Sequence, residues 1–72
     1  MAEITDPLVT RDGIKVGIGQ RWRDLDKRML GRIVEVVDVN VRTGHAIIKG
    51  AKLGRLAVRR MYRHSTGWEL VL

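Results

Sequence analysis

The segment GRIVEVVDVNV, residues 31–41, restricts the fold more than any other part of the chain. It is rich in β-branched residues, and apolar and polar side chains alternate along much of its length, which is typical of a half-buried strand. The following RTGHAIIKG offers a turn at Thr43 and Gly44 and a second β-rich run at residues 45–49. We expect the two runs to pair antiparallel as a hairpin.

Strand and turn signals also occur near both ends of the chain. Asp12-Gly13 lies between two short β-rich runs, residues 8–10 and 14–16, and this dipeptide favours a type I′ hairpin turn. The last residues, GWELVL at 67–72, are typical of a closing strand.

Residues 21–31, RWRDLDKRMLG, carry a helical signal instead. Trp22, Leu25 and Met29 stand at i, i+3 and i+7, and Gly31 is available as a C-cap. The segment therefore fits either an amphipathic helix or an irregular loop rich in Asp and Lys.

Residues 51–63, AKLGRLAVRRMYR, are ambiguous in the same way, because their apolar residues also fit a helix. Against a helix, Gly54 costs about 1 kcal/mol relative to Ala inside one. Leu56 and Val58 alternate as in a strand. We favour a strand, whereas a helix would make this segment the recognition helix of a winged or helix-turn-helix domain.

The predicted order is a strand around residues 16–22, a loop, three successive strands, a short turn at 61–64 and a final strand. This order predicts an all-β fold, namely a five-stranded SH3-like small barrel with a short turn of 3-10 helix before the last strand. We expect residues 1–6, which show no pattern, to be frayed, and residues 7–72 to form a single domain.

Four stretches carry a resemblance to a known group of proteins: VGIGQRWRDLDKR (16–28), GRIVEVV (31–37), GRLAVRRM (54–61) and STGWELV (65–71). In these stretches the chain resembles small proteins of actinobacteria and their phages with a KOW- or Tudor-like barrel layout. The pattern usually has Tyr where Trp68 stands here. The resemblance implies a binding module, frequently for nucleic acid, and a bacterial or phage origin, but no particular activity.

Size and composition exclude several classes of protein. A 72-residue domain buries only about 60% of the surface of its unfolded chain. We therefore expect no deep small-molecule cavity and no small-molecule substrate. The sequence has no cysteine, so it offers neither a disulfide framework nor a thiolate zinc site. It has no apolar run typical of a signal peptide or a transmembrane helix. We expect a cytoplasmic protein without a membrane partner, in a bacterial host cell if the chain is phage-encoded.

The net charge of +6 is distributed unevenly. Residues 1–40 carry seven Lys or Arg and seven Asp or Glu, whereas residues 41–72 carry seven Lys or Arg and one acid, Glu69. Such a one-sided basic surface is the electrostatic footprint of a phosphate-bearing partner. A basic face that serves only solubility is the alternative.

The predicted partner is nucleic acid, DNA rather than RNA, bound mainly through its backbone phosphates. Arginine outnumbers lysine in the basic half, and its guanidinium can fork onto phosphate oxygens and stack on bases. We expect Tyr62 to be the exposed aromatic residue, and Trp22 and Trp68 to fill the core. The candidate nucleic-acid-binding residues are Arg42, Lys49, Lys52, Arg55, Arg59, Arg60, Tyr62 and Arg63. A protein-interaction module that docks a host protein is the alternative function.

No residue pattern indicates catalysis, a metal or another cofactor. Asp24 and Asp26 are too few for a calcium loop and stand among Arg and Lys, which predicts a salt-bridged loop. His45 and His64 lack a third ligand at zinc spacing and a nucleophile partner. GIG at 17–19 fits a turn or bulge rather than a phosphate loop. The sequence therefore predicts a non-enzymatic binding protein.

Overall fold

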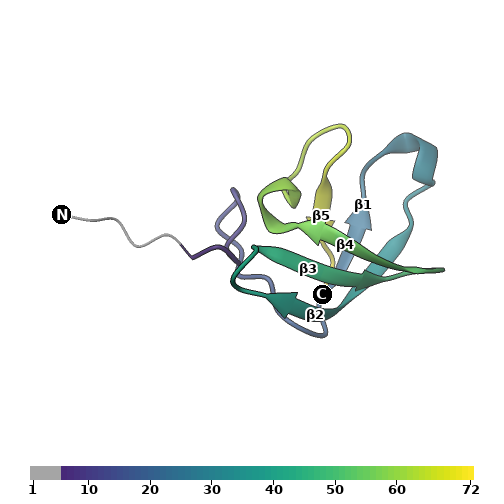
Figure 1. The fold of residues 1–72 in the computed structure, drawn as a ribbon. Helices are drawn as coiled ribbons and strands as arrows, with labels where there is room; N and C mark the ends of the chain where they lie inside the picture. The colour runs from purple at the N-terminus through teal and green to yellow at the C-terminus, as the bar shows by residue number, and fades with distance from the viewer. Residues whose placement is uncertain (1–5) are drawn as a thin grey trace.

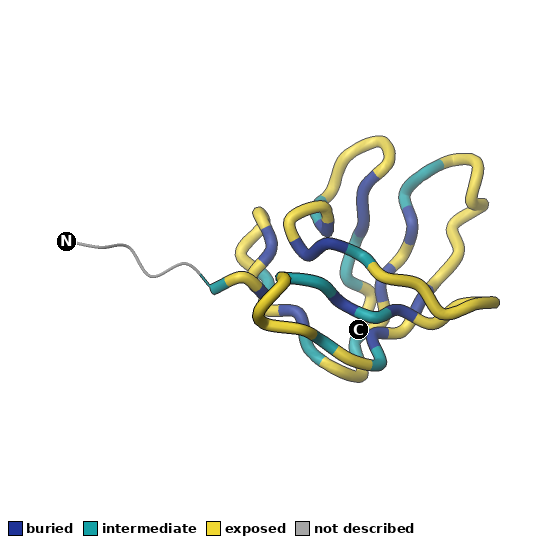
Figure 2. The backbone as a smooth tube through the Cα atoms, in the orientation of Figure 1, coloured by how far each residue is buried: buried dark blue, intermediate teal, exposed yellow. Residues whose placement is uncertain are grey.

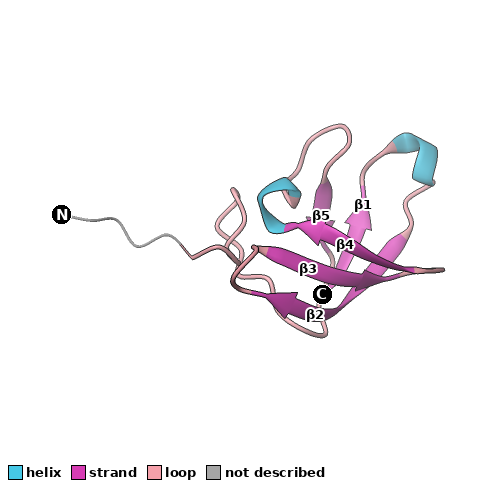
Figure 3. Cartoon of the chain, viewed as in Figure 1, coloured by secondary structure: helices cyan, strands magenta, loops and turns pink. Residues whose placement is uncertain are grey.

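The computed structural model describes residues 6–72, and its strands form one antiparallel sheet in the order β4-β3-β2-β1-β5 (Figure 1). Two single-turn 3-10 helices, η1 and η2, connect strands (Figure 3). The all-β prediction is confirmed. The elements are β1 (Arg21–Asp24), η1 (Lys27–Met29), β2 (Ile33–Asn40), β3 (His45–Lys49), β4 (Leu53–Ala57), η2 (Val58–Arg60) and β5 (Trp68–Leu70). No helix among residues 6–72 is long and apolar enough to cross a membrane.

The β2–β3 hairpin forms as the sequence predicts. Val34 and Val36 of β2 are buried while Ile33 and Glu35 are exposed, so the period-two pattern places one face on the core. Gly44 lies in the hairpin turn at φ +68°, and its N–H donates to the Asn40 carbonyl at 2.9 Å. A Cβ at Gly44 would stand 3.3 Å from the Pro7 carbonyl oxygen, so both the turn and the close approach favour glycine.

The sheet is open. β4 and β5 are its two edges, and no strand pairing joins them within residues 6–72. The expectation of a barrel is therefore met only as far as a five-stranded antiparallel sheet. The two edges nevertheless face each other, because Leu56 of β4 and Trp68 of β5 line the same hollow.

The core lies on the concave side of this sheet and contains both tryptophans, as predicted. Trp22 is 1% exposed and Trp68 is 6% exposed. Met61 and Val58 are fully buried with them, so the segment that links β4 to β5 closes one side of the core. Figure 2 shows buried positions along the strands and exposed ones at the loop tips.

The first strand begins later than predicted. The strand expected at 16–22 is β1, which spans Arg21–Asp24. Of residues 16–20, only Val16 is buried in the core. Residues 17–20 form a turn instead, as GIG suggested: the Gln20 N–H donates to the Gly17 carbonyl at 3.3 Å, and Gly19 has φ +94°. The β1 register is set by pairing with β2 and β5, which local sequence does not reveal.

The segment at 21–31 forms no amphipathic helix. Its helical part is one turn, η1, whose N-cap Asp26 accepts a hydrogen bond from the Arg28 N–H at 3.0 Å. Leu30 ends this turn in the left-handed conformation at φ 53° with 93% of its surface exposed. Gly31, expected as the cap, has φ +70° in the next position.

Two turn predictions need correction. The 3-10 turn expected at 61–64 lies earlier in the chain, as η2 at Val58–Arg60. It forms there because the burial of Val58 and Met61 turns the chain away from the edge of the sheet. The Asp12-Gly13 turn forms, but only Gly13 has a positive φ, so it is not type I′. The segments beside that turn pair through a single bridge, Val9 to Lys15.

The predicted frayed N-terminus falls mainly on residues 1–5, which lie outside the described residues. Asp6, the last residue of that predicted segment, is anchored. Its carboxylate accepts a hydrogen bond from the Leu8 N–H at 2.8 Å and pairs with Lys15.

Candidate nucleic-acid interface

The cations of the two halves of the chain differ in whether they form ion pairs. Four ion pairs occur among residues 6–72, and each uses a cation from the N-terminal half. Even the acid of the C-terminal half, Glu69, pairs with Arg23 of β1 at 3.6 Å. The other pairs are Lys15–Asp6, Arg28–Asp26 at 2.7 Å and Arg32–Asp24 at 2.9 Å.

The cations of the C-terminal half form no ion pair with any carboxylate among residues 6–72. Their charge is therefore not neutralised by direct contact within the described part of the chain. These seven residues are Arg42, Lys49, Lys52, Arg55, Arg59, Arg60 and Arg63.

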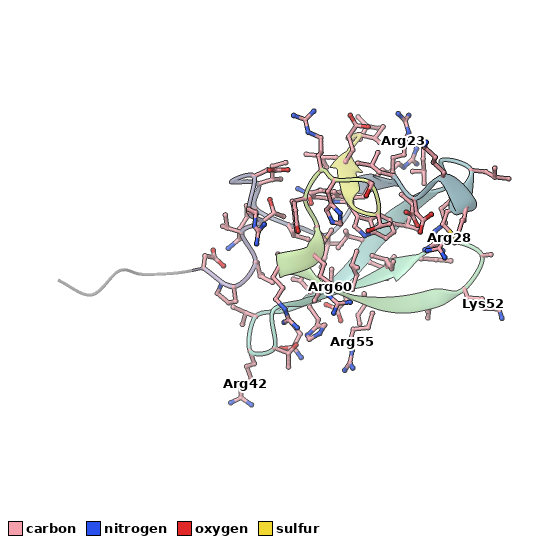
Figure 4. The ribbon with its side chains drawn as sticks, turned by 90° about the horizontal axis from the view of Figure 1, so that it is seen from above. Arg23, Arg28, Arg42, Lys52, Arg55 and Arg60 are labelled. Carbon is pink, nitrogen blue, oxygen red and sulfur yellow. The ribbon has the colours of Figure 1, made fainter. Side chains whose placement is uncertain are left out.

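Five of the seven lie along β4 and at its two ends. Arg55 is exposed in the middle of β4, and Lys52 stands in the turn before the strand. In Figure 4, Arg42 and Arg55 point away from the domain toward the same side, and Lys52 projects outward at the tip of the turn before β4. We call this set the β4 basic strip: Arg42, Lys52, Arg55, Arg59 and Arg60.

The far end of the strip is held together by one backbone contact. The Val58 N–H at the start of η2 donates to the Gly44 carbonyl in the β2–β3 turn at 2.8 Å. This bond places η2, with Arg59 and Arg60, beside the turn that carries Arg42. From Lys52 to Arg59 the chain advances about 20 Å, given about 3.3 Å per residue in a strand and about 2 Å in a 3-10 turn. Measured along the axis of duplex DNA, that length corresponds to about six phosphates of one strand, which rise about 3.4 Å each.

Lys49 and Arg63 lie outside the strip. Lys49 is opposite Glu35 in the β2–β3 register, so an acid is its cross-strand neighbour. Arg63 lines a hollow with Asp12 and Glu69, and its backbone N–H donates to the Asp12 carboxylate at 3.1 Å. Two of the predicted binding residues therefore stand next to acids.

Tyr62 is the most exposed of the three aromatic residues, as expected, but it is half-buried rather than free. The Arg11 guanidinium lies 4.4 Å from the centre of its ring, a cation–π contact. The His64 ring lies 4.3 Å away, centre to centre, tilted by 36°. Tyr62 thus belongs to a packed group of side chains.

A hollow of about 370 Å³ lies between β4 and the segment that leads into β5. We call it the aromatic hollow. A second hollow of about 380 Å³ adjoins it along β4, shares Leu56 and Trp68, and is also lined by Arg32, Lys52 and Arg55. These hollows lie between elements at the surface. The residues of the aromatic hollow are Leu56, Arg60, Tyr62, His64, Thr66 and Trp68.

The acids of the β1–β2 connection form ion pairs, as the sequence predicts, but one partner is new. Asp24 is 5% exposed and pairs with Arg32, eight residues later, rather than with its immediate neighbours. Hydrogen bonding to Arg28 lowers the pKa of the Asp26 carboxyl from 3.8 to about 2. Hydrogen bonding to Lys15 likewise lowers the pKa of Asp6. The carboxylates of Asp24 and Asp26 accordingly serve the fold of the loop.

Within residues 6–72, no group of three or more His, Cys, Asp or Glu is placed to hold a metal ion. The Nδ1 atom of His45 is buried without a hydrogen-bond partner in the described part of the chain. His64 lies far along the sequence, in the aromatic hollow.

Sequence reasoning missed two arginines of this region. Arg11 contacts Tyr62, and Arg32 lies 5.7 Å from the centre of the Trp68 ring. Both come from the half of the chain whose charges balance, and nothing in their local sequence points to a ring many residues away. Only the folded chain brings them to these rings.

Comparison with protein-family models, with curated proteins and with solved structures finds no match to this chain.

Proposed function

We propose that this chain is a non-enzymatic nucleic-acid-binding protein that holds backbone phosphates, of DNA rather than RNA, on the β4 basic strip. In this proposal the five-stranded sheet is an SH3-like small barrel of bacterial or phage origin, acting in the cytoplasm. The strand order, with a 3-10 turn between β4 and β5, supports the SH3-like part of the proposal.

One observation carries the proposal. Every ion pair of residues 6–72 uses a cation of the N-terminal half, and the cations of the strip pair with no carboxylate in that part of the chain. A surface that serves only solubility has no need to keep five cations along one strand and apart from the acids. Such a row is suited to a polyanion, whose condensed counterions are released when the cations replace them.

The mechanism is multivalent phosphate capture with little reading of sequence. Arg55, Arg59 and Arg60 each offer a guanidinium fork that fits phosphate oxygens, and Lys52 adds a flexible point charge. If five cations contact phosphates, the log–log slope of affinity against salt is about −4.5 on duplex DNA.

The test is fluorescence anisotropy of a labelled DNA duplex at several salt concentrations, with the same sequence as single-stranded DNA and as RNA. The variant is Arg59→Gln/Arg60→Gln. We expect its slope on duplex DNA to fall to about −2.7, because three of five contacts remain.

The matched control is Arg23→Gln/Arg28→Gln, which removes the same net charge at two ion-paired sites outside the strip. We expect it to bind nearly as the parent chain does. Equal weakening by both double variants would mean that only net charge matters and would contradict the proposed strip. Tighter binding of RNA would contradict the choice of DNA.

The free edge of β4 favours a second candidate, a module that docks a protein of the bacterial host by strand addition. Within residues 6–72, β4 pairs with β3 only, and Leu53 at its start is 69% exposed. Strand addition depends on main-chain hydrogen bonds and apolar contacts. Binding by strand addition would therefore survive moderate salt and the loss of Arg59 and Arg60. Phosphate binding would be weakened by both.

A further inference from the structure

The aromatic hollow combines ring faces with unneutralised charge. The rings of Tyr62, His64 and Trp68 line it, and Arg60 of the β4 basic strip stands at its border. Its volume of about 370 Å³ is within the range of pockets that hold small ligands. It is therefore suited to one planar ring with its sugar rather than to an extended chain.

Backbone hydrogen bonds fix the segment that carries the rings of the hollow. The Trp68 N–H donates to the Tyr62 carbonyl, and the Gly67 N–H donates to the His64 carbonyl, both at 2.9 Å. Arg11 packs on the Tyr62 ring from outside the segment. Because the rings are already ordered, binding loses little conformational freedom.

We propose that the aromatic hollow receives one unpaired base of single-stranded nucleic acid, while Arg60 and the cations of the adjoining hollow hold the neighbouring phosphates. This inference rests on the proposed function and assigns its ligand class. A base inside a duplex has both faces stacked on its neighbours, so only an unpaired base offers a face to the rings. The adjoining hollow continues the cationic path with Lys52 and Arg55, while its Arg32 is held by Asp24.

His64 is the best residue for testing the stacking contact. It is exposed, so its replacement removes a ring without opening the core. His64→Ala removes the ring, whereas His64→Phe keeps a ring and is the matched control. Tyr62→Leu tests the second ring independently.

The probes are a labelled 12-nucleotide oligothymidylate, a 12-nucleotide strand of the same backbone without bases, and a 12-base-pair duplex, all measured by anisotropy at the same series of salt concentrations. We expect oligothymidylate to bind at least about fivefold more tightly than the abasic strand. His64→Ala and Tyr62→Leu should each remove at least about fivefold of that affinity and leave the abasic strand unaffected, while His64→Phe retains it.

Equal binding of oligothymidylate and the abasic strand overturns the base site. If that equal binding still falls steeply with salt, the phosphate-binding function stands without it. Unchanged affinity for oligothymidylate in both ring variants also overturns the base site. Failure of all three probes to bind overturns both proposals.

Discussion

Replacing Gly67 by alanine is expected to displace the segment that forms the aromatic hollow. A Cβ at this position would overlap the carbonyl oxygen of Tyr62 and the ring carbon Cδ2 of His64, and would stand 2.8 Å from His64 Nε2. The Tyr62 carbonyl cannot move aside freely, because it accepts the Trp68 N–H at 2.9 Å. The Gly67 carbonyl in turn accepts the Leu25 N–H at 2.9 Å. The overlap is therefore with anchored backbone.

The loss of unfolding free energy in Gly67→Ala follows from two effects. Forcing a methyl group into a filled site costs about 1–3 kcal/mol. Moving the segment also breaks the Trp68–Tyr62 and Gly67–His64 hydrogen bonds, each worth about 1 kcal/mol net. We expect a loss of about 3–5 kcal/mol. A domain of 72 residues has a total free energy of unfolding of about 4–11 kcal/mol at about 0.05–0.15 kcal/mol per residue.

Urea denaturation followed by tryptophan fluorescence measures this loss. With a slope of about 1 kcal/mol per molar urea, the midpoint of Gly67→Ala should fall by about 3–5 M. The control is Gly17→Ala, where an added Cβ meets nothing within 4 Å and φ is not left-handed. We expect Gly17→Ala to be neutral or to stabilise by up to about 1 kcal/mol. Equal midpoints for the two variants would refute the argument from overlap.

Two further predictions concern the β1–β2 connection. In carboxyl NMR titrations, Asp26 should have a pKa of about 2, so the pairing with Arg28 contributes to stability above about pH 4 and is lost as the pH falls from there toward 2. Arg28→Gln should move the pKa of Asp26 back up toward 3.8, and an unchanged pKa would exclude the Arg28 hydrogen bond as its cause. Leu30→Gly should raise the urea midpoint by the equivalent of up to about 1 kcal/mol, because the exposed leucine is in a left-handed conformation that costs about 1–2 kcal/mol, partly offset by the entropy of glycine. A lower midpoint would show that the exposed Leu30 side chain stabilises the fold.

Much of the fold was predictable where local preference and burial agree. The alternation in β2, the Thr43-Gly44 turn and the burial of Trp22 follow from residue type and spacing. The extent of β1 was not predictable in this way, because its pairing with β2 begins only at Arg21 and residues 17–20 form a turn, although Val16 and Ile18 favour a strand. The sequence likewise determined the charge asymmetry of the two halves, a property of composition alone.

The tertiary structure decided which charges meet. Asp24 forms an ion pair with Arg32, and Arg23 forms one with Glu69 of the other half, because strand pairing places these residues side by side. The same pairing leaves the β4 basic strip without acidic contacts within residues 6–72. The folded chain also places Arg11 against Tyr62. β4 and β5 stay apart, and the aromatic hollow forms between them. These contacts join residues distant along the chain. Sequence spacing therefore carries no signal for them, and only the register and curvature of the sheet determine them.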